Sequence, residues 1–126
     1  MRTEGTHILL EYWWCDPIIL DDRASIRILM QEAAQATGAR IVETVCTPYV
    51  PQGISVVVVI EESHLSIHTW PEASYAAVDL FTCGTKCKPE KAHEVLVKGL
   101  NAQQHKMMKI LRGIPSAPYL RVLSPD

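Results

Sequence analysis

The sequence predicts an α+β fold, in which one mainly antiparallel β-sheet carries two helices on one face as a two-layer sandwich. Two observations lead to this prediction. Strand-like segments outnumber helical ones in the order β-α-β-β-β-α-β, and the middle strands follow one another through short links. The chain has 126 residues, of which 48% are apolar, and this is enough for one hydrophobic core. We therefore expect a single domain over residues 1–126.

The first half of the chain contains an expected strand, helix and strand. The apolar and aromatic segment 6–14 lies between a glycine and an Asp-Pro turn, which is typical of a strand. After it, with Asp21 or Asp22 as the N-cap, apolar side chains recur at helical spacing until Gly38, which is placed to end the helix. Segment 39–46 is the next expected strand.

The second half consists mainly of expected strands. The run of Val and Ile over 54–60 predicts a strand that is buried on both faces. Pro89 suits the first turn of a second helix, because its missing N–H is not needed there. The expected elements after residue 46 are a Pro-containing loop over 47–53, strands over 54–60, 65–70 and 75–82, a helix over 89–100, a strand over 105–111, and an extended or partly disordered tail over 114–126, with three prolines.

A sheet with helices on one face leaves its other face uncovered. A second copy of the chain, stacked sheet to sheet, would cover that face. The sequence therefore predicts a homodimer.

Composition and charge argue against several kinds of partner. The formal charge of −2 provides no basic stripe for nucleic acid. No apolar run approaches the roughly 20 residues that cross a bilayer, and the N-terminal apolar stretch is too short for a signal peptide. We expect a cytoplasmic protein, bound to neither nucleic acid nor membrane, in which the dispersed cysteines are thiols: Cys15, Cys46, Cys83 and Cys87.

The run from Glu62 to Glu72 concentrates hydroxyl, imidazole and carboxylate side chains directly after the apolar segment 54–60. In a regular strand Ser63 and His68 would point to opposite faces, because side chains alternate. Any mechanism that uses both residues therefore requires a bend or a strained peptide between residues 62 and 64.

Two interpretations of the histidines stay open at this point. In the first, Ser63 is a nucleophile and His68 its base, although the G-x-S-x-G motif of many hydrolases is absent. In the second, His64, His68 and Cys83 bind a metal ion. Isolated histidines at strand ends more often only form hydrogen bonds, so we expect no metal.

Two further groups have a functional and a structural interpretation each. Tyr49, Trp70 and Glu72 suit a pocket for a planar ligand with hydroxyl groups, or the two aromatic rings fill the core. Cys83 suits a proton donor, or it is a small buried side chain.

Several ordered motifs resemble the prokaryotic S-adenosylmethionine decarboxylase family, over roughly residues 5–100. They are Pro51-Gln52-Gly53-Ile54-Ser55, the run from Glu62 to Glu72, Tyr75-Ala76-Ala77-Val78-Asp79, Phe81-Thr82-Cys83-Gly84 and, near the N-terminus, His7-Ile8-Leu9 and Cys15-Asp16. A series of ordered motifs is far more specific than one serine–histidine match.

The resemblance implies that Ser63 is the precursor of a pyruvoyl cofactor. The Ser63 hydroxyl would attack the carbonyl of Glu62, and the chain would cleave itself between these residues into a β chain of 1–62 and an α chain of 63–126. His68 would remove the Cα proton, and Ser55 would help to hold the tetrahedral intermediate. The pyruvoyl group would then form a Schiff base with the substrate amine and accept the electrons of decarboxylation, with Cys83 as the proton donor.

The same resemblance implies S-adenosylmethionine as substrate, bound by Tyr49, Leu65, Trp70 and Glu72, and a product used in spermidine synthesis. It also implies a homodimer of αβ protomers. Members of this family usually have Phe at the position of Tyr49 and Gly at the positions of Val56 and Ser74. The alternatives are the same pyruvoyl chemistry on arginine or ornithine, and a non-enzymatic metal- or ligand-binding module.

Overall fold

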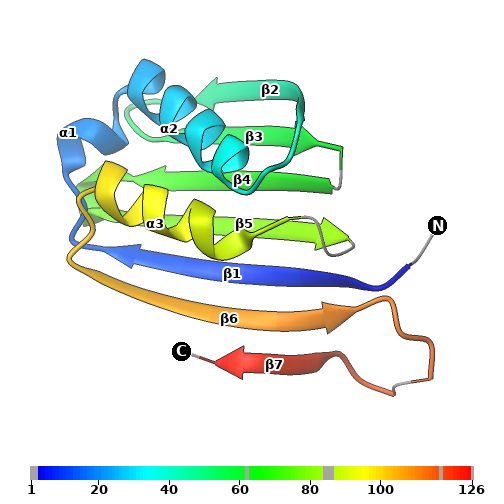
Figure 1. Cartoon of the computed structure of the whole chain (residues 1–126). Coiled ribbons are helices and arrows are strands. Elements are labelled where there is room, and N and C mark those ends of the chain that lie inside the picture. The colour runs from blue at the N-terminus through cyan, green and yellow to red at the C-terminus, as the bar shows by residue number, and fades with distance from the viewer. Residues whose placement is uncertain (1–2, 62, 84–86, 117, 126) are drawn as a thin grey trace.

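The computed structural model describes residues 3–61, 63–83, 87–116 and 118–125 (Figure 1). The elements within these ranges are β1 (Gly5–Trp13), α1 (Pro17–Leu20), α2 (Arg23–Ala36), β2 (Ile41–Pro48), β3 (Ile54–Ile60), β4 (Ser63–Trp70), the 3-10 helix η1 (Pro71–Ala73), β5 (Tyr75–Cys83), α3 (Pro89–Gly99), β6 (Gln104–Arg112) and β7 (Arg121–Pro125).

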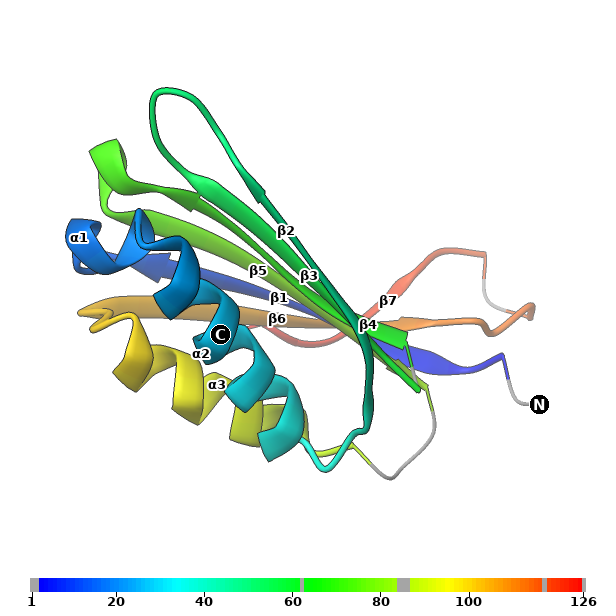
Figure 2. The ribbon, with the colours of Figure 1, turned by 90° about the horizontal axis from the view of Figure 1, so that it is seen from above.

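The strands form one sheet in the order β2-β3-β4-β5-β1-β6-β7, and each neighbouring pair is antiparallel. Helices α2 and α3 lie on the same face of this sheet, and no helix of the described ranges covers the opposite face (Figure 2). We call that opposite face the open face. The predicted α+β class, with two main helices on one side of an antiparallel sheet, is confirmed.

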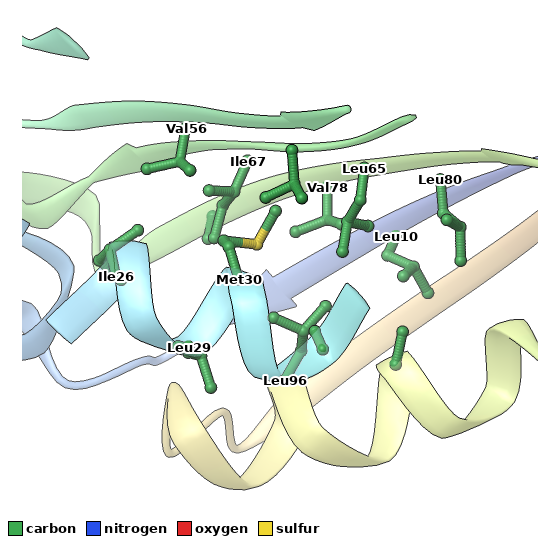
Figure 3. Packing of buried hydrophobic residues seen from close by; sticks show 14 of the residues in the cluster. Leu10, Ile26, Leu29, Met30, Val56, Leu65, Ile67, Val78, Leu80 and Leu96 are labelled. Atoms are coloured by element: carbon green, nitrogen blue, oxygen red, sulfur yellow. The ribbon is translucent and has the colours of Figure 1, made fainter. Parts of the chain in front are cut away.

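The hydrophobic core lies between the sheet and the two long helices (Figure 3). Alternate residues of the central strands point into it, and Leu10, Leu65 and Val78 are at most 2% exposed. Ile26 and Met30 of α2 and Leu96 of α3 meet them from the other side, each fully buried. The helical spacing and the strand alternation therefore place their apolar faces on one shared core.

Both ends of α2 follow the local rules that the sequence analysis used. The Asp22 carboxylate accepts a hydrogen bond from the Ser25 N–H at 3.2 Å, so Asp22 is the N-cap. At the other end Gly38 has a φ of 90°, which a residue with a side chain adopts only at a cost.

Three elements were absent from the sequence predictions: α1, the 3-10 helix η1 and β7. The helix α1 has only four residues, too few to show a helical period, although Asp16 caps it and Pro17 begins it. The tail was expected as an extended arm, and the structure adds that its residues 121–125 pair with β6 as a seventh strand. Backbone hydrogen bonds make this edge strand, and exposed side chains such as Val122 leave no burial pattern to detect in the sequence.

Candidate active site on the open face of the sheet

The strands β3 and β4 place polar side chains on the open face. Ser55 of β3 pairs with His68 of β4, and His64 and Ser66 project from β4 on the same side as His68. The intervening side chain of Leu65 points to the helices and is fully buried. The Leu65 side chain therefore belongs to the core, and the expected contact between Leu65 and substrate stays a prediction.

Three polar side chains form a chain of hydrogen bonds at one end of the open face. The Tyr49 hydroxyl lies 2.8 Å from Ser55 Oγ, and Ser55 Oγ lies 2.5 Å from Nδ1 of His68. Ser55 is 8% exposed, whereas Tyr49 is 51% exposed and offers its ring to solvent. We call this group the Tyr49–Ser55–His68 chain.

The loop that carries Tyr49 is tied to the rest of the fold by backbone hydrogen bonds. The Tyr49 N–H donates to the Gly53 carbonyl at 2.8 Å, and the Gly53 N–H donates to the Asp21 carboxylate at 3.0 Å. Gly53 has a φ of 101°, and a Cβ at this position would lie 2.9 Å from the Thr69 carbonyl oxygen. Glycine is therefore required at position 53. Asp21 holds the loop through its hydrogen bond to Gly53, and the sequence analysis did not predict this role for Asp21.

Aromatic rings continue the site beyond His68. The ring of Trp70 stacks on Tyr75 with centroids 5.2 Å apart, and Tyr75 stacks on Trp13 at 4.3 Å. The Tyr75 hydroxyl lies 2.7 Å from each carboxylate oxygen of Glu11 and donates its one hydrogen to this carboxylate. Burial raises the pKa of Tyr75 above its ordinary value, and the hydrogen bond to Glu11 raises it further. Glu72 follows Trp70 in η1 and is exposed.

Ser63 lies at the other end of β4 and has an unusual backbone conformation. Its φ is 146°, a value that side-chain-bearing residues rarely adopt. The Ser63 hydroxyl lies 3.2 Å from Nδ1 of its neighbour His64. The strained peptide predicted between residues 62 and 64 is thus present at Ser63, while Glu62, the other residue of the expected cleavage site, lies outside the described residues.

Cys83 ends β5 close to Ser63, since Ser63 pairs with Thr82. A charged and aromatic cluster surrounds this end of the face. His7 Nε2 lies 3.1 Å from the Asp79 carboxylate, and the Arg112 guanidinium stacks over the Phe81 ring at 4.6 Å.

The structure separates the expected site residues into two groups. Ser55 and His68 lie together with Tyr49, Trp70 and Glu72, whereas Ser63 and Cys83 lie at the opposite end of the strands. Five residues of strand correspond to about 16 Å. The strained peptide at Ser63 therefore does not bring its hydroxyl to His68 of the same chain.

The metal interpretation requires His64, His68 and Cys83 to meet. His64 and His68 are four positions apart on one strand, or about 13 Å. Within the described ranges, no three His, Cys, Asp or Glu side chains gather closely enough to hold a metal ion. In the same ranges, no helix is long and apolar enough to cross a membrane.

An antiparallel sheet with helices on one face and a serine–histidine pair on the other defines an α+β protein whose site is built on a bare sheet face. The family model described as S-adenosylmethionine decarboxylase matches residues 6–113. The chain belongs to the S-adenosylmethionine decarboxylase family, which confirms the resemblance seen in the motifs.

Known relatives agree with this assignment. The chain is 49% identical over 113 residues to an S-adenosylmethionine decarboxylase proenzyme of Thermosipho melanesiensis, covering 90% of this chain and 87% of the relative. It is 42% identical over 111 residues to one of Prochlorococcus marinus, covering 88% and 91%. The crystal structure of the adenosylmethionine decarboxylase from Aquifex aeolicus superimposes with a TM-score of 0.82 at 31% identity, covering 94% of this chain and 98% of that one.

Proposed function

We propose that this chain is a proenzyme that cleaves itself between Glu62 and Ser63 and then decarboxylates S-adenosylmethionine, with a pyruvoyl group derived from Ser63. The decarboxylated product would be the aminopropyl donor for spermidine synthesis. The observation that carries the proposal is the Ser55–His68 hydrogen bond at 2.5 Å on the open face of a member of this family. The cytoplasmic location expected from the composition is part of the same proposal.

The place of Ser63 in the fold suits self-cleavage. β3 ends at Ile60 and β4 begins at Ser63, so a cut before Ser63 divides no strand. The two fragments would remain joined, because β3 belongs to one and β4 to the other and these strands pair along their length. A strained residue at the cut also raises the energy of the uncleaved state relative to the transition state.

Each proposed cleavage step has a side chain suited to it. The Ser63 hydroxyl adds to the Glu62 carbonyl, the C–N bond breaks, and an ester replaces the amide. A Ser55 hydroxyl next to the reacting carbonyl would stabilise the oxyanion. His68 would take the Cα proton of Ser63 while the bond between its Cβ and Oγ breaks, so that the upstream chain leaves as a carboxylate. The dehydroalanine left behind would tautomerise to an imine, and water would hydrolyse this imine to the ketone with release of ammonia. The pyruvoyl group so formed would act as the electron sink for decarboxylation.

A second copy of the chain would bring the two separated groups together. Sheets stacked by a two-fold axis place the same surface of each copy against the other. If the strands of the two copies run in opposite directions, the end of the sheet that carries Ser63 and Cys83 in one copy lies over the end that carries Ser55 and His68 in its partner. The uncovered open face and the distance between Ser63 and His68 both support this homodimer.

The substrate is proposed from the surface around His68. The exposed ring of Tyr49 and the 41% exposed ring of Trp70 suit stacking on a planar base, and the exposed Glu72 carboxylate suits ribose hydroxyl groups. Arginine and ornithine contain neither a nucleobase nor a ribose. S-adenosylmethionine therefore fits these side chains better than the two amino acids do.

The proposal is tested in two stages. Purified chain should run as two fragments of about half of 14.1 kDa, and the Ser63→Ala variant as one intact chain. Carbon dioxide release should then be measured in parallel from S-adenosylmethionine, arginine and ornithine. An intact wild-type chain after long incubation would reject self-cleavage, and faster release from either amino acid would reject the proposed substrate.

A further inference from the structure

We infer that the Tyr49 hydroxyl is a positioning group for self-cleavage: it accepts the hydrogen of Ser55 and so keeps His68 in the form whose Nε2 is free to act as a base. This inference rests on the proposed self-cleavage, and it gives Tyr49 a role separate from stacking on the substrate.

The two hydrogen bonds allow only a few arrangements of protons. A serine hydroxyl has one hydrogen to donate, and Ser55 Oγ lies within hydrogen-bonding distance of two groups. Neutral imidazole carries its hydrogen on one of its two nitrogen atoms. If Nδ1 of His68 is unprotonated, Ser55 donates to it. If Nδ1 carries the hydrogen, Ser55 accepts from it and must donate elsewhere.

The proposed role of His68 selects the second arrangement. A base that removes a Cα proton needs an unprotonated nitrogen facing the reaction. Nδ1 of His68 is already occupied by Ser55 at 2.5 Å, whereas Nε2 makes no hydrogen bond within the ranges that the structure describes. The free base is therefore Nε2, and Nδ1 carries the hydrogen and donates it to Ser55.

Burial makes this arrangement dependent on Tyr49. Ser55 is 8% exposed, so its hydrogen has little access to water. Besides His68, the Tyr49 oxygen at 2.8 Å is the hydrogen-bonding partner of Ser55 among the described residues. A buried hydroxyl without an acceptor is costly. Without the Tyr49 oxygen, Ser55 would turn its hydrogen to Nδ1, and the proton of His68 would move to Nε2.

Tyr49 is held in place for this role. Its own N–H is bonded to the Gly53 carbonyl, and Gly53 is bonded in turn to Asp21. The exposed part of the phenol leaves its own hydrogen free to bind water. During cleavage, a rotation about the Cβ–Oγ bond of Ser55 is enough to turn its hydrogen from Tyr49 to a developing oxyanion. Nδ1–H of His68 continues to donate to Ser55 Oγ during this rotation.

Substitutions of Tyr49 can test the role of its hydroxyl separately from the role of its ring. Tyr49→Phe keeps the stacking surface and removes only the acceptor, and it restores the residue that is usual in the family. Tyr49→Leu removes both. Tyr119→Phe makes the same chemical change on an 84% exposed tyrosine in the tail and is the matched control.

The first readout is the rate of self-cleavage. Newly synthesised chains from a cell-free translation are followed on gels as the full-length chain disappears. We expect Tyr49→Phe to slow cleavage by about three- to tenfold, as for the loss of one neutral hydrogen bond, and Tyr119→Phe to leave it unchanged. The KM of the processed Tyr49→Phe enzyme should change by less than about twofold, because the ring remains, whereas Tyr49→Leu should raise it more. An unchanged rate in Tyr49→Phe would overturn the inference.

The second readout is the position of the His68 proton. In uncleaved Ser63→Ala protein labelled with ¹⁵N-histidine, the His68 signals should show hydrogen on Nδ1, and adding Tyr49→Phe should move it toward Nε2. Loss of the signals in His68→Asn assigns them. Hydrogen on Nε2 in Ser63→Ala, or identical signals with and without Tyr49→Phe, would overturn the inference. This readout needs no cleavage, so failure of the wild type to cleave would reject the proposed function separately.

Discussion

Ser63 begins strand β4 and pairs with Ile60, whereas His68 lies five residues further along the strand and pairs with Ser55. The strand between them spans about 16 Å, far beyond the reach of a serine and a histidine side chain. The strand is also paired on both sides, to β3 and to β5, so it cannot fold back on itself without breaking the sheet. We therefore propose that a reaction that uses both residues draws them from two copies of the chain.

We expect two inactive variants to restore cleavage in each other. Ser63→Ala lacks the hydroxyl and His68→Ala lacks the base, so each expressed alone should stay intact. When both are expressed in one cell, mixed dimers join an intact Ser63 from one copy to an intact His68 from the other. A tag of different size on each variant identifies the cleaved chain on a gel.

Only the His68→Ala chain should be cleaved in this experiment, because only that chain contains Ser63. As a control, a chain that contains both substitutions should rescue neither variant. If the two variants remain intact although mixed dimers are isolated through both tags, the site is not shared between copies.

The strain at Ser63 predicts an unusual ranking of two substitutions. Neither Ser63→Gly nor Ser63→Ala can cleave, so their stabilities are directly comparable. Glycine adopts a φ of 146° without the steric cost that alanine meets, and we expect Ser63→Gly to be more stable by about 1 kcal/mol in urea unfolding.

Ser66 supplies the control for this comparison. It lies in the middle of the same strand and has ordinary strand geometry, so the order should reverse there, with Ser66→Gly less stable than Ser66→Ala by about 0.5–1 kcal/mol. If Ser63→Gly were less stable than Ser63→Ala by the same amount as the Ser66 pair, about 0.5–1 kcal/mol, the backbone at Ser63 would store no strain.

The sequence predicted the elements that bury apolar side chains better than the elements that do not. The strand over 54–60 matches β3 at both ends, because a run of Val and Ile defines a buried strand. Strand β4 begins at Ser63, two residues before the expected start, because its backbone pairs with Ile60 and Thr82 beyond the apolar pattern. Strand β7 is held by backbone pairing at an edge, which leaves little trace in side-chain composition.

The candidate site was predicted residue by residue, but its division into two groups was not. The motifs named Ser55, Ser63 and His68, and only the register of β3 against β4 shows that Ser55 is next to His68. Contacts between side chains far apart in sequence, such as Tyr75 with Glu11, likewise depend on strand pairing. No periodicity in one segment contains that information.

Tyr75 and Glu11 give a prediction for alkaline pH. Burial and the bonded Glu11 carboxylate both raise the pKa of Tyr75 above its ordinary value of 10.0. The folded state therefore gains stability from neutral Tyr75 below pH 10.0, and loses it as the pH rises through the folded-state pKa. Glu11→Gln removes the negative charge but not the burial. Phenolate absorbance should then show that the pKa of Tyr75 in Glu11→Gln is lower than in the wild type but still above the ordinary value for tyrosine. The same substitution in a Tyr75→Phe background should leave the titration unchanged, and a shift that persists there would assign the effect to another tyrosine.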